Sequence, residues 1–357
     1  MSEKESQSVE FKSKWSDDCL KTIVAFANSA GGKLYIGLDN KGEVIGVTDA
    51  KKLLEDIPNK VKNKLFITPF VNHEKQGGKD VIIIEVLPST FPVFYEGKIF
   101  IRSGSTNQEL TGLELNSFIL EKTGKTWDKL HSDATENDLD KKTIEKFITL
   151  AENRLPLIKE IKTTDELLKK LNLYTKDMRL TRGAVLLFGK NPQFYFPSAY
   201  TKVGRFKTPT DILDTVVVEG NLFQQLDRTI EAIKKHLNVK FDTSVKDFSL
   251  EGFARQDVWE YPLDALREAL INALIHRDYL GTAPIQIKIF DDYIEFWNLG
   301  KLLPPLKPED LKKIHQANHR NPQIAAIFYY TGLIESWGSG TIKMINLCKE
   351  TGLPEPN

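Results

Sequence analysis

Three polar side chains recur at one-turn spacing in the segment ALREALINALIHRDY, residues 265–279. Glu268, Asn272 and His276 are four residues apart, so on a helix they line one face. A carboxylate can accept a proton from water, and an amide oxygen is the hard type of ligand that Mg²⁺ prefers. A polar row beside an apolar stripe also describes most amphipathic helices. Asn is mildly unfavourable inside a helix, however, so its presence here invites a functional explanation.

Two further motifs follow this predicted helix, which we place at 263–278. Strands expected at 285–290 and 293–297 lead into Asn298-Leu-Gly300, and Gly338-Ser339-Gly340 leads directly into a helix expected at 341–348. A glycine-rich turn at a helix N-terminus offers bare backbone N–H groups and a positive dipole end, which suit phosphate. A lone Gly-x-Gly usually marks only a turn. The inference of a phosphate site therefore depends on the order of all three motifs.

This order resembles the GHKL ATPases, and the phrase at 265–279 is similar to bacterial regulators that carry an ATP-binding domain of that type. The resemblance covers about residues 260–352 and implies a Bergerat-type α/β sandwich that binds ATP and Mg²⁺. It places Asn272 on the Mg²⁺ that bridges the phosphates and Glu268 as the general base of a weak ATPase. The other implied ATP-binding residues are Asn298, Gly300, Gly338, Ser339 and Gly340.

The sequence departs from the GHKL pattern at two positions of the second motif. Asn298 stands where gyrase-like members have the Asp that binds the adenine amino group, and Leu302 replaces a glycine. An Asn carbonyl can still accept that hydrogen bond. We therefore expect ATP to bind, and leave open whether it is hydrolysed. Relatives continue beyond the position of Asn357 with further strands and often a winged helix, so we expect either that the sequence is truncated at this point or that this part is absent.

A second set of motifs lies near the N-terminus. It comprises Glu5-Ser-Gln-Ser-Val-Glu10-Phe-Lys, AFANSAGG at 25–32, YIGLDN at 35–40 and RSGSTN at 102–107. As a set these resemble the schlafen AlbA-like domain over residues 3–120, which implies a nucleic-acid-binding module. Some animal members are RNA endonucleases with three carboxylates, and Glu5 and Glu10 fit the first two metal-ligand positions. The third falls on Asn40, with Asp39 one residue away, so a metal-dependent nuclease is the alternative rather than the leading hypothesis.

Basic residues that could form a phosphate-contacting face cluster on and around a helix expected at 50–64. A solvated helix face is the other interpretation, because lysine is common on surfaces. The candidate nucleic-acid-binding residues are Lys12, Lys14, Lys33, Lys51, Lys52, Lys60, Lys62, Lys64 and Arg102.

Composition limits the class of protein. The 357 residues carry 49 Lys and Arg against 49 Asp and Glu, which excludes a uniformly basic nucleic-acid coat and an acidic tail. Two distant cysteines form neither a disulfide framework nor a metal cluster, and no apolar run is long enough for a membrane span. We therefore predict a cytoplasmic protein with no membrane partner, in which a small basic face binds DNA more tightly if the chain forms a homo-oligomer.

The predicted fold class is α/β (α+β), in three parts. Residues 1–125 form the schlafen AlbA-like domain, 126–258 a mixed α/β connecting domain and 259–357 the GHKL-type domain. In the middle part we expect strands at 184–188 and 200–206 and a helix at 221–237. The leading hypothesis is an ATP-binding transcriptional regulator that contacts DNA. The alternatives are an ATP-gated, metal-dependent nuclease and a protein-interaction scaffold.

Overall fold

A computed structural model of the chain describes residues 4–242, 256–303, 305–335 and 338–357. The architecture is mixed α/β, and the chain divides into two compact units, one ending at Lys125 and one beginning at Thr126. Within the described part, none of the helices combines the length and the apolar character that a bilayer crossing requires.

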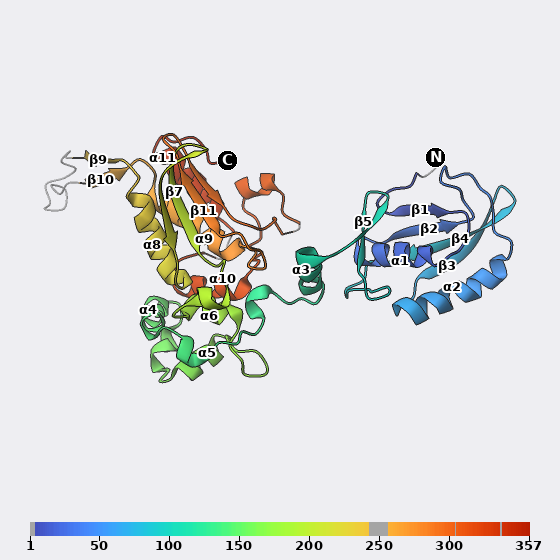
Figure 1. The fold of residues 1–357 in the computed structure, drawn as a ribbon, viewed down its shortest axis with the longest axis horizontal. Coiled ribbons are helices and arrows are strands. Elements are labelled where there is room, and N and C mark those ends of the chain that lie inside the picture. Colours follow the sequence, from blue (N-terminus) through green and yellow to red (C-terminus); the bar gives the residue numbers. More distant parts are fainter. Residues whose placement is uncertain (1–3, 243–255, 304, 336–337) are drawn as a thin grey trace. The chain divides into compact units, whose positions relative to one another are not determined.

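The first unit is built on a four-stranded sheet in the order β1-β2-β4-β3 (Figure 1). β1 and β2 are parallel, whereas β2–β4 and β4–β3 are antiparallel. Two helices cover one face of this sheet, and a hairpin and a third helix complete the unit. The elements are β1 (Val9–Lys12), α1 (Asp18–Asn28), β2 (Gly32–Ile36), α2 (Ala50–Leu65), β3 (Phe70–Gln76), β4 (Lys79–Val86), β5 (Phe100–Ser103), β6 (Thr106–Glu109) and α3 (Gly112–Lys122).

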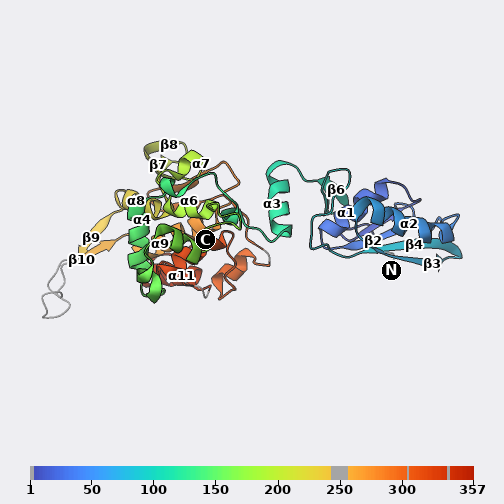
Figure 2. The same cartoon turned by 90° about the horizontal axis from the view of Figure 1, so that it is seen from below.

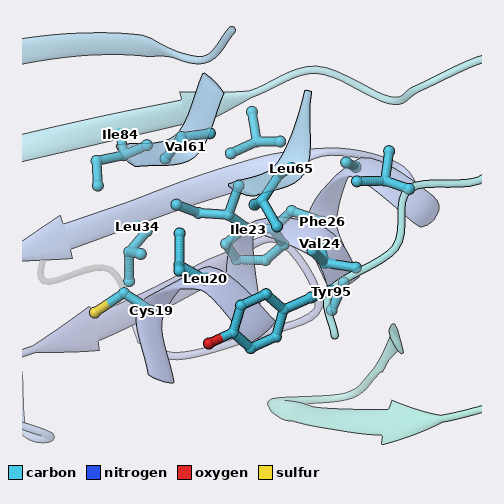
Figure 3. Close-up of a cluster of buried hydrophobic side chains, with 14 of the residues drawn as sticks. Cys19, Leu20, Ile23, Val24, Phe26, Leu34, Val61, Leu65, Ile84 and Tyr95 are labelled. Atoms are coloured by element: carbon cyan, nitrogen blue, oxygen red, sulfur yellow. The ribbon is translucent and has the colours of Figure 1, made fainter. Parts of the chain in front are cut away.

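The core of this unit lies between the sheet and helices α1 and α2. Successive strand residues point to opposite faces, so Leu34, Ile36, Ile82 and Ile84 all face the helices. Figure 3 shows Leu34 and Ile84 in one cluster with α1 side chains such as Phe26. Burial of these apolar side chains is the main stabilising contribution, at roughly 1.5–3 kcal/mol for each large one.

The second unit contains another four-stranded mixed sheet, in the order β12-β11-β7-β8. β7 and β11 are parallel, and the two outer pairs are antiparallel. Strands from both sides of residue 258, where the sequence placed a domain boundary, therefore share one sheet. The sheet strands are β7 (Thr201–Thr208), β8 (Asp211–Val218), β11 (Ile285–Ile289) and β12 (Ile294–Trp297), and a separate antiparallel pair is formed by β9 (Val239–Asp242) and β10 (Gln256–Trp259).

Helices α8 and α9 are in contact with strands of this second sheet and with each other. Figure 2 shows the same elements from a second direction, in which the β9–β10 pair again extends beyond α8. The helices are α4 (Lys141–Ala151), α5 (Thr164–Lys170), α6 (Arg182–Phe188), α7 (Pro192–Tyr195), α8 (Leu222–Lys234), α9 (Leu263–His276), α10 (Pro322–Tyr330) and α11 (Gly340–Glu350). Short 3₁₀ segments are η1 (Trp127–Lys129), η2 (Glu136–Asp138), η3 (Pro156–Glu160) and η4 (Pro308–Lys312).

One predicted strand is wrong. Residues 184–188 belong to α6, whose N-cap Thr181 accepts a hydrogen bond from the backbone N–H of Ala184. The helix is buried on all sides, so its apolar run shows no periodicity that could separate a strand from a helix. The expected helix at 263–278 and strands at 285–290 and 293–297 are confirmed as α9, β11 and β12.

Candidate functional site

A cavity of about 500 Å³ lies beside α9 and the N-terminus of α11. Its lining brings together three motifs that are up to 72 residues apart in the sequence. All seven residues predicted to bind or hydrolyse ATP line it: Glu268, Asn272, Asn298, Gly300, Gly338, Ser339 and Gly340. The order of motifs along the chain therefore corresponds to one site in space, and the roles of the individual residues stay predictions.

One end of the cavity is formed where α11 begins against α9. A Cβ atom added to Gly340 would lie 2.0 Å from Oε1 of Glu268, so only glycine permits this approach. Gly338 adopts a φ of +66°, and a Cβ there would lie 1.8 Å from the carbonyl oxygen of His315. Ser339, the N-cap of α11, makes no side-chain capping hydrogen bond. The first N–H groups of an eleven-residue helix thus lack a side-chain cap at this end of the cavity.

Lys343 is a functional candidate that the sequence reasoning missed. It lies in the first turn of α11, lines the cavity, and its charge acts on the carboxylate of Glu268. The sequence does contain a signal for Lys343, because this lysine follows a Gly-x-Gly motif by one turn at the start of a predicted helix. Together with the helix dipole, its ammonium group makes this end of the cavity attractive to an anion.

Glu268 and Asn272 form a polar pair on the cavity side of α9. The Asn272 Nδ2 donates to Glu268 Oε1 at 3.2 Å, a bond that does not involve the Asn272 amide oxygen. Burial raises the pKa of Glu268, and the hydrogen bond from Asn272 and the charge of Lys343 partly offset that effect. A carboxylate with a raised pKa is a stronger base, which is the property that water activation requires.

The opposite end of the cavity lies at the C-terminus of α9. A Cβ at Gly300 would be 2.9 Å from the carbonyl oxygen of His276, and the Asp278 N–H donates to the Leu299 carbonyl at 2.6 Å. These contacts hold the 298–300 turn against the end of α9. Asn321 supports the same end, because its Nδ2 donates to the carbonyls of Ile275 at 2.7 Å and of Arg277 at 2.8 Å.

Two histidines, His276 and His319, lie together at this end. The rings of His276 and His319 are 5.4 Å apart and inclined at 44°, and both residues line the cavity. Burial, followed by the neighbouring His319 and Arg320, lowers the pKa of His276 to about 4. Burial also lowers the pKa of His319. Both imidazoles are therefore neutral at pH 7.

In the first unit, Glu10 and Arg102 form a buried ion pair. Arg102 Nη2 lies 3.0 Å from Glu10 Oε2, and the two side chains are only 0% and 8% exposed. Lys12 Nζ contacts the other carboxylate oxygen at 2.7 Å. Arg102 also donates to the Ser6 carbonyl and to Asn107 Oδ1, both at 2.8 Å. Glu10 is thus the counter-ion of an internal arginine.

This ion pair changes the interpretation of two predicted site residues. Arg102 was expected on an exposed nucleic-acid face, which is wrong, because its guanidinium is enclosed. Its partner Glu10 is 92 positions away in the sequence, so no local pattern could reveal the pairing. The alternative metal site also lacks support, since Glu5 accepts a bond from the Phe11 N–H at 3.2 Å and the described residues contain no cluster of three metal-ligating side chains.

The eight predicted lysines differ in availability. Lys12 is held by Glu10, and Lys60 is paired with Asp17. The others are exposed and have no acidic partner among the residues that the structure describes: Lys14, Lys33, Lys51, Lys52, Lys62 and Lys64. Four of these six belong to α2, in which Ile57, Val61 and Leu65 are buried in the core.

Comparison with known families identifies both ends of the chain. Residues 5–111 match the family model described as "Schlafen, AlbA_2", and residues 282–357 match the model described as "Putative ATP-dependent DNA helicase recG C-terminal". The chain thus carries a Schlafen AlbA_2 domain at its N-terminal end and an ATPase-type domain at its C-terminal end, which confirms the predicted fusion. These domains indicate a protein that binds nucleic acid and a nucleotide. α9, with Glu268 and Asn272, precedes the second matched segment.

Two solved structures are similar to the chain. The DIP2311 protein from Corynebacterium diphtheriae is 22% identical with a TM-score of 0.51, over 98% of this chain and 72% of that one, and shares the fold. The N-terminal domain of a "Putative ATP-dependent DNA Helicase RecG-related Protein" from Nitrosomonas europaea is 26% identical over 30% of this chain and 86% of that one, with a TM-score of 0.24. No match is found among the curated proteins.

Proposed function

We propose that the protein is an ATP-binding transcriptional regulator, in which the cavity beside α9 and α11 binds Mg-ATP and the first unit contacts DNA. One observation supports nucleotide binding most strongly: seven residues predicted from three separate sequence motifs line a single cavity of about 500 Å³. That volume falls within the range of small-molecule and cofactor sites in proteins.

The two ends of the cavity suggest how a nucleotide lies in it. The uncapped start of α11 and the ammonium group of Lys343 would hold the phosphates. The amide oxygen of Asn272 fits a Mg²⁺ site in which phosphate and water oxygens supply the other ligands. Such an ion would neutralise phosphate charge when bound. Glu268, with its raised pKa, lies beside this end and would accept a proton from water in a slow hydrolysis reaction.

The DNA part is supported by the exposed lysines of the first unit. Lys51 and Lys52 at the start of α2 and Lys62 and Lys64 at its end are unpaired within the described residues and can reach backbone phosphates. A change in nucleotide state that alters DNA affinity or self-association would make the protein a regulator. The nuclease alternative gains no support from the enclosed position of Glu10.

A titration of ATP, with and without Mg²⁺, tests the nucleotide part. Asn272→Ala should remove most of the Mg²⁺ dependence, because it deletes the amide oxygen assigned to the ion. Asn346→Ala is the matched control, since Asn346 is an exposed asparagine of α11 that does not line the cavity. Equal Mg-ATP affinity in both variants would refute the assignment of Asn272.

Salt-dependent DNA binding tests the other part. The variant Lys51→Glu/Lys52→Glu should weaken binding and reduce the slope of log Kd against log salt by about 1 per lost phosphate contact. The control is Lys141→Glu/Lys142→Glu, an exposed lysine pair at the start of α4 in the other unit. Binding that is insensitive to salt, or weakened equally by both pairs, would contradict the proposed face.

A further inference from the structure

The end of the cavity farthest from the phosphate end contains groups that suit a nucleobase. Glu268 and His276 are eight residues apart on α9, which corresponds to about 12 Å along the helix axis. Gly340 contacts Glu268 at one end, and Gly300 contacts His276 at the other. If the phosphates lie at the start of α11, as the proposed function requires, the base lies near His276, His319 and Asn298.

Asn298 lines this end of the cavity, and its side-chain amide can both donate and accept hydrogen bonds. Its side chain forms no hydrogen bond with any residue that the structure describes, and it is only partly buried. A primary amide carries one acceptor oxygen and a two-donor nitrogen, and rotating it by half a turn exchanges their positions. Asn298 can therefore present an acceptor or a donor at the same place.

The neighbouring histidines have the same property. A neutral imidazole has one donor and one acceptor nitrogen, and its tautomer decides which nitrogen is which. His319 Nδ1 is buried and has no hydrogen-bond partner within the described ranges. The charge of Arg320 acts on His276, and Arg320 Nη2 donates to the Lys301 carbonyl at 2.6 Å. Two carboxylates are among the described residues that line the cavity: Glu268 beside the start of α11, and Glu335, whose Oε1 accepts a hydrogen bond from Arg154 Nη2 at 2.7 Å.

These groups matter because the two purines present opposite patterns. Adenine offers an amino donor beside a ring acceptor, whereas guanine offers a carbonyl acceptor beside a ring donor. An ionised carboxylate accepts hydrogen bonds only, so where it faces the 6-position of the base it pairs with the adenine amino group and repels the guanine carbonyl. An amide can satisfy either base after rotation. We propose that this end of the cavity is an adaptable purine site that accepts ATP and GTP alike, with Asn298 as the specificity-determining residue.

Calorimetric titrations of the full chain with Mg-ATP and Mg-GTP test this proposal, which rests on the proposed nucleotide site. The wild-type dissociation constants should differ by less than about fivefold, since both bases find a complementary amide. Asn298→Asp should raise the ratio of the GTP to the ATP dissociation constant about 10–100-fold, because one base then faces a wrong hydrogen-bonding partner. Asn346→Asp adds the same charge on an exposed face of α11 and should leave the ratio unchanged.

The outcomes separate the two proposals. If the wild-type chain binds ATP but rejects GTP by more than about tenfold, the adaptable site is refuted and the nucleotide site stands. If Asn298→Asp leaves the ratio unchanged while the variant still binds ATP, Asn298 does not determine specificity. If neither nucleotide binds the wild-type chain, both proposals fail. The wild-type comparison decides the question even where the variant does not fold.

Discussion

Replacing Glu10 with glutamine is the sharpest perturbation of the first unit. The substitution keeps the size of the side chain and removes its charge, and the guanidinium of Arg102 then lies buried without a carboxylate partner. Removing one partner from a buried ion pair costs about 3–5 kcal/mol of folding free energy. We expect about 3 kcal/mol, the lower end of this range, because Arg102 keeps its bonds to Ser6 and Asn107 and the glutamine oxygen can still accept one.

Amide hydrogen exchange in β2 and β4 measures this loss within the intact chain, without interference from the second unit. A cost of about 3 kcal/mol should accelerate exchange of the best protected amides by about 150-fold. Glu5→Gln is the matched control, since Glu5 is only half-buried and accepts one backbone bond. It should change exchange by less than about tenfold. Equal effects of the two substitutions, or no effect of Glu10→Gln, would refute the buried ion pair as a stabilising element.

Two further predictions concern the second unit. Gly340→Ala should weaken Mg-ATP binding by about 10–100-fold, because its Cβ would lie 2.0 Å from Glu268 Oε1 and displace the carboxylate or the start of α11. Asn346→Ala, on the exposed face of the same helix and outside the cavity lining, should leave the affinity unchanged in the same titration. The pKa of His276 is lowered to about 4, so between about pH 6.5 and 4 the unfolded state binds a proton that the folded state does not. The unfolding free energy should therefore fall as the pH is lowered through this window. His276→Gln should flatten the slope in chemical denaturation, whereas replacement of the exposed His131 should not.

The residues that line the cavity could be assigned to helices and turns from the sequence, because their positions follow from local rules. The four-residue spacing of Glu268 and Asn272 is a helical period, and Gly338 and Gly340 precede a helix, so neither inference needs tertiary information. The order of the motifs then indicated one site, and the structure places them around one cavity. His319 was missed because it approaches His276 only after 42 intervening residues have folded, and its spacing to other ligand types is irregular.

The role of Arg102 could not be predicted for a different physical reason. Arginine is usually exposed, so a surface position was the better expectation from the residue type alone. Its burial depends on Glu10, which lies on β1, whereas Arg102 lies on β5, 92 positions later in the sequence. The prediction of a strand at 184–188 was wrong for a similar reason, because a fully buried helix such as α6 has no polar face that would reveal its helical period. Residues enclosed by distant parts of the chain are thus the ones that local patterns misplace.

Photolabelling with 8-azido-ATP tests most directly whether the cavity beside α9 and α11 is the nucleotide site. The azide is attached to the base, so we expect adducts on peptides that contain His276, Asn298 or His319. Excess Mg-ATP should reduce this labelling by competition. Labelling that falls outside the cavity lining, or that excess Mg-ATP does not reduce, would contradict this assignment.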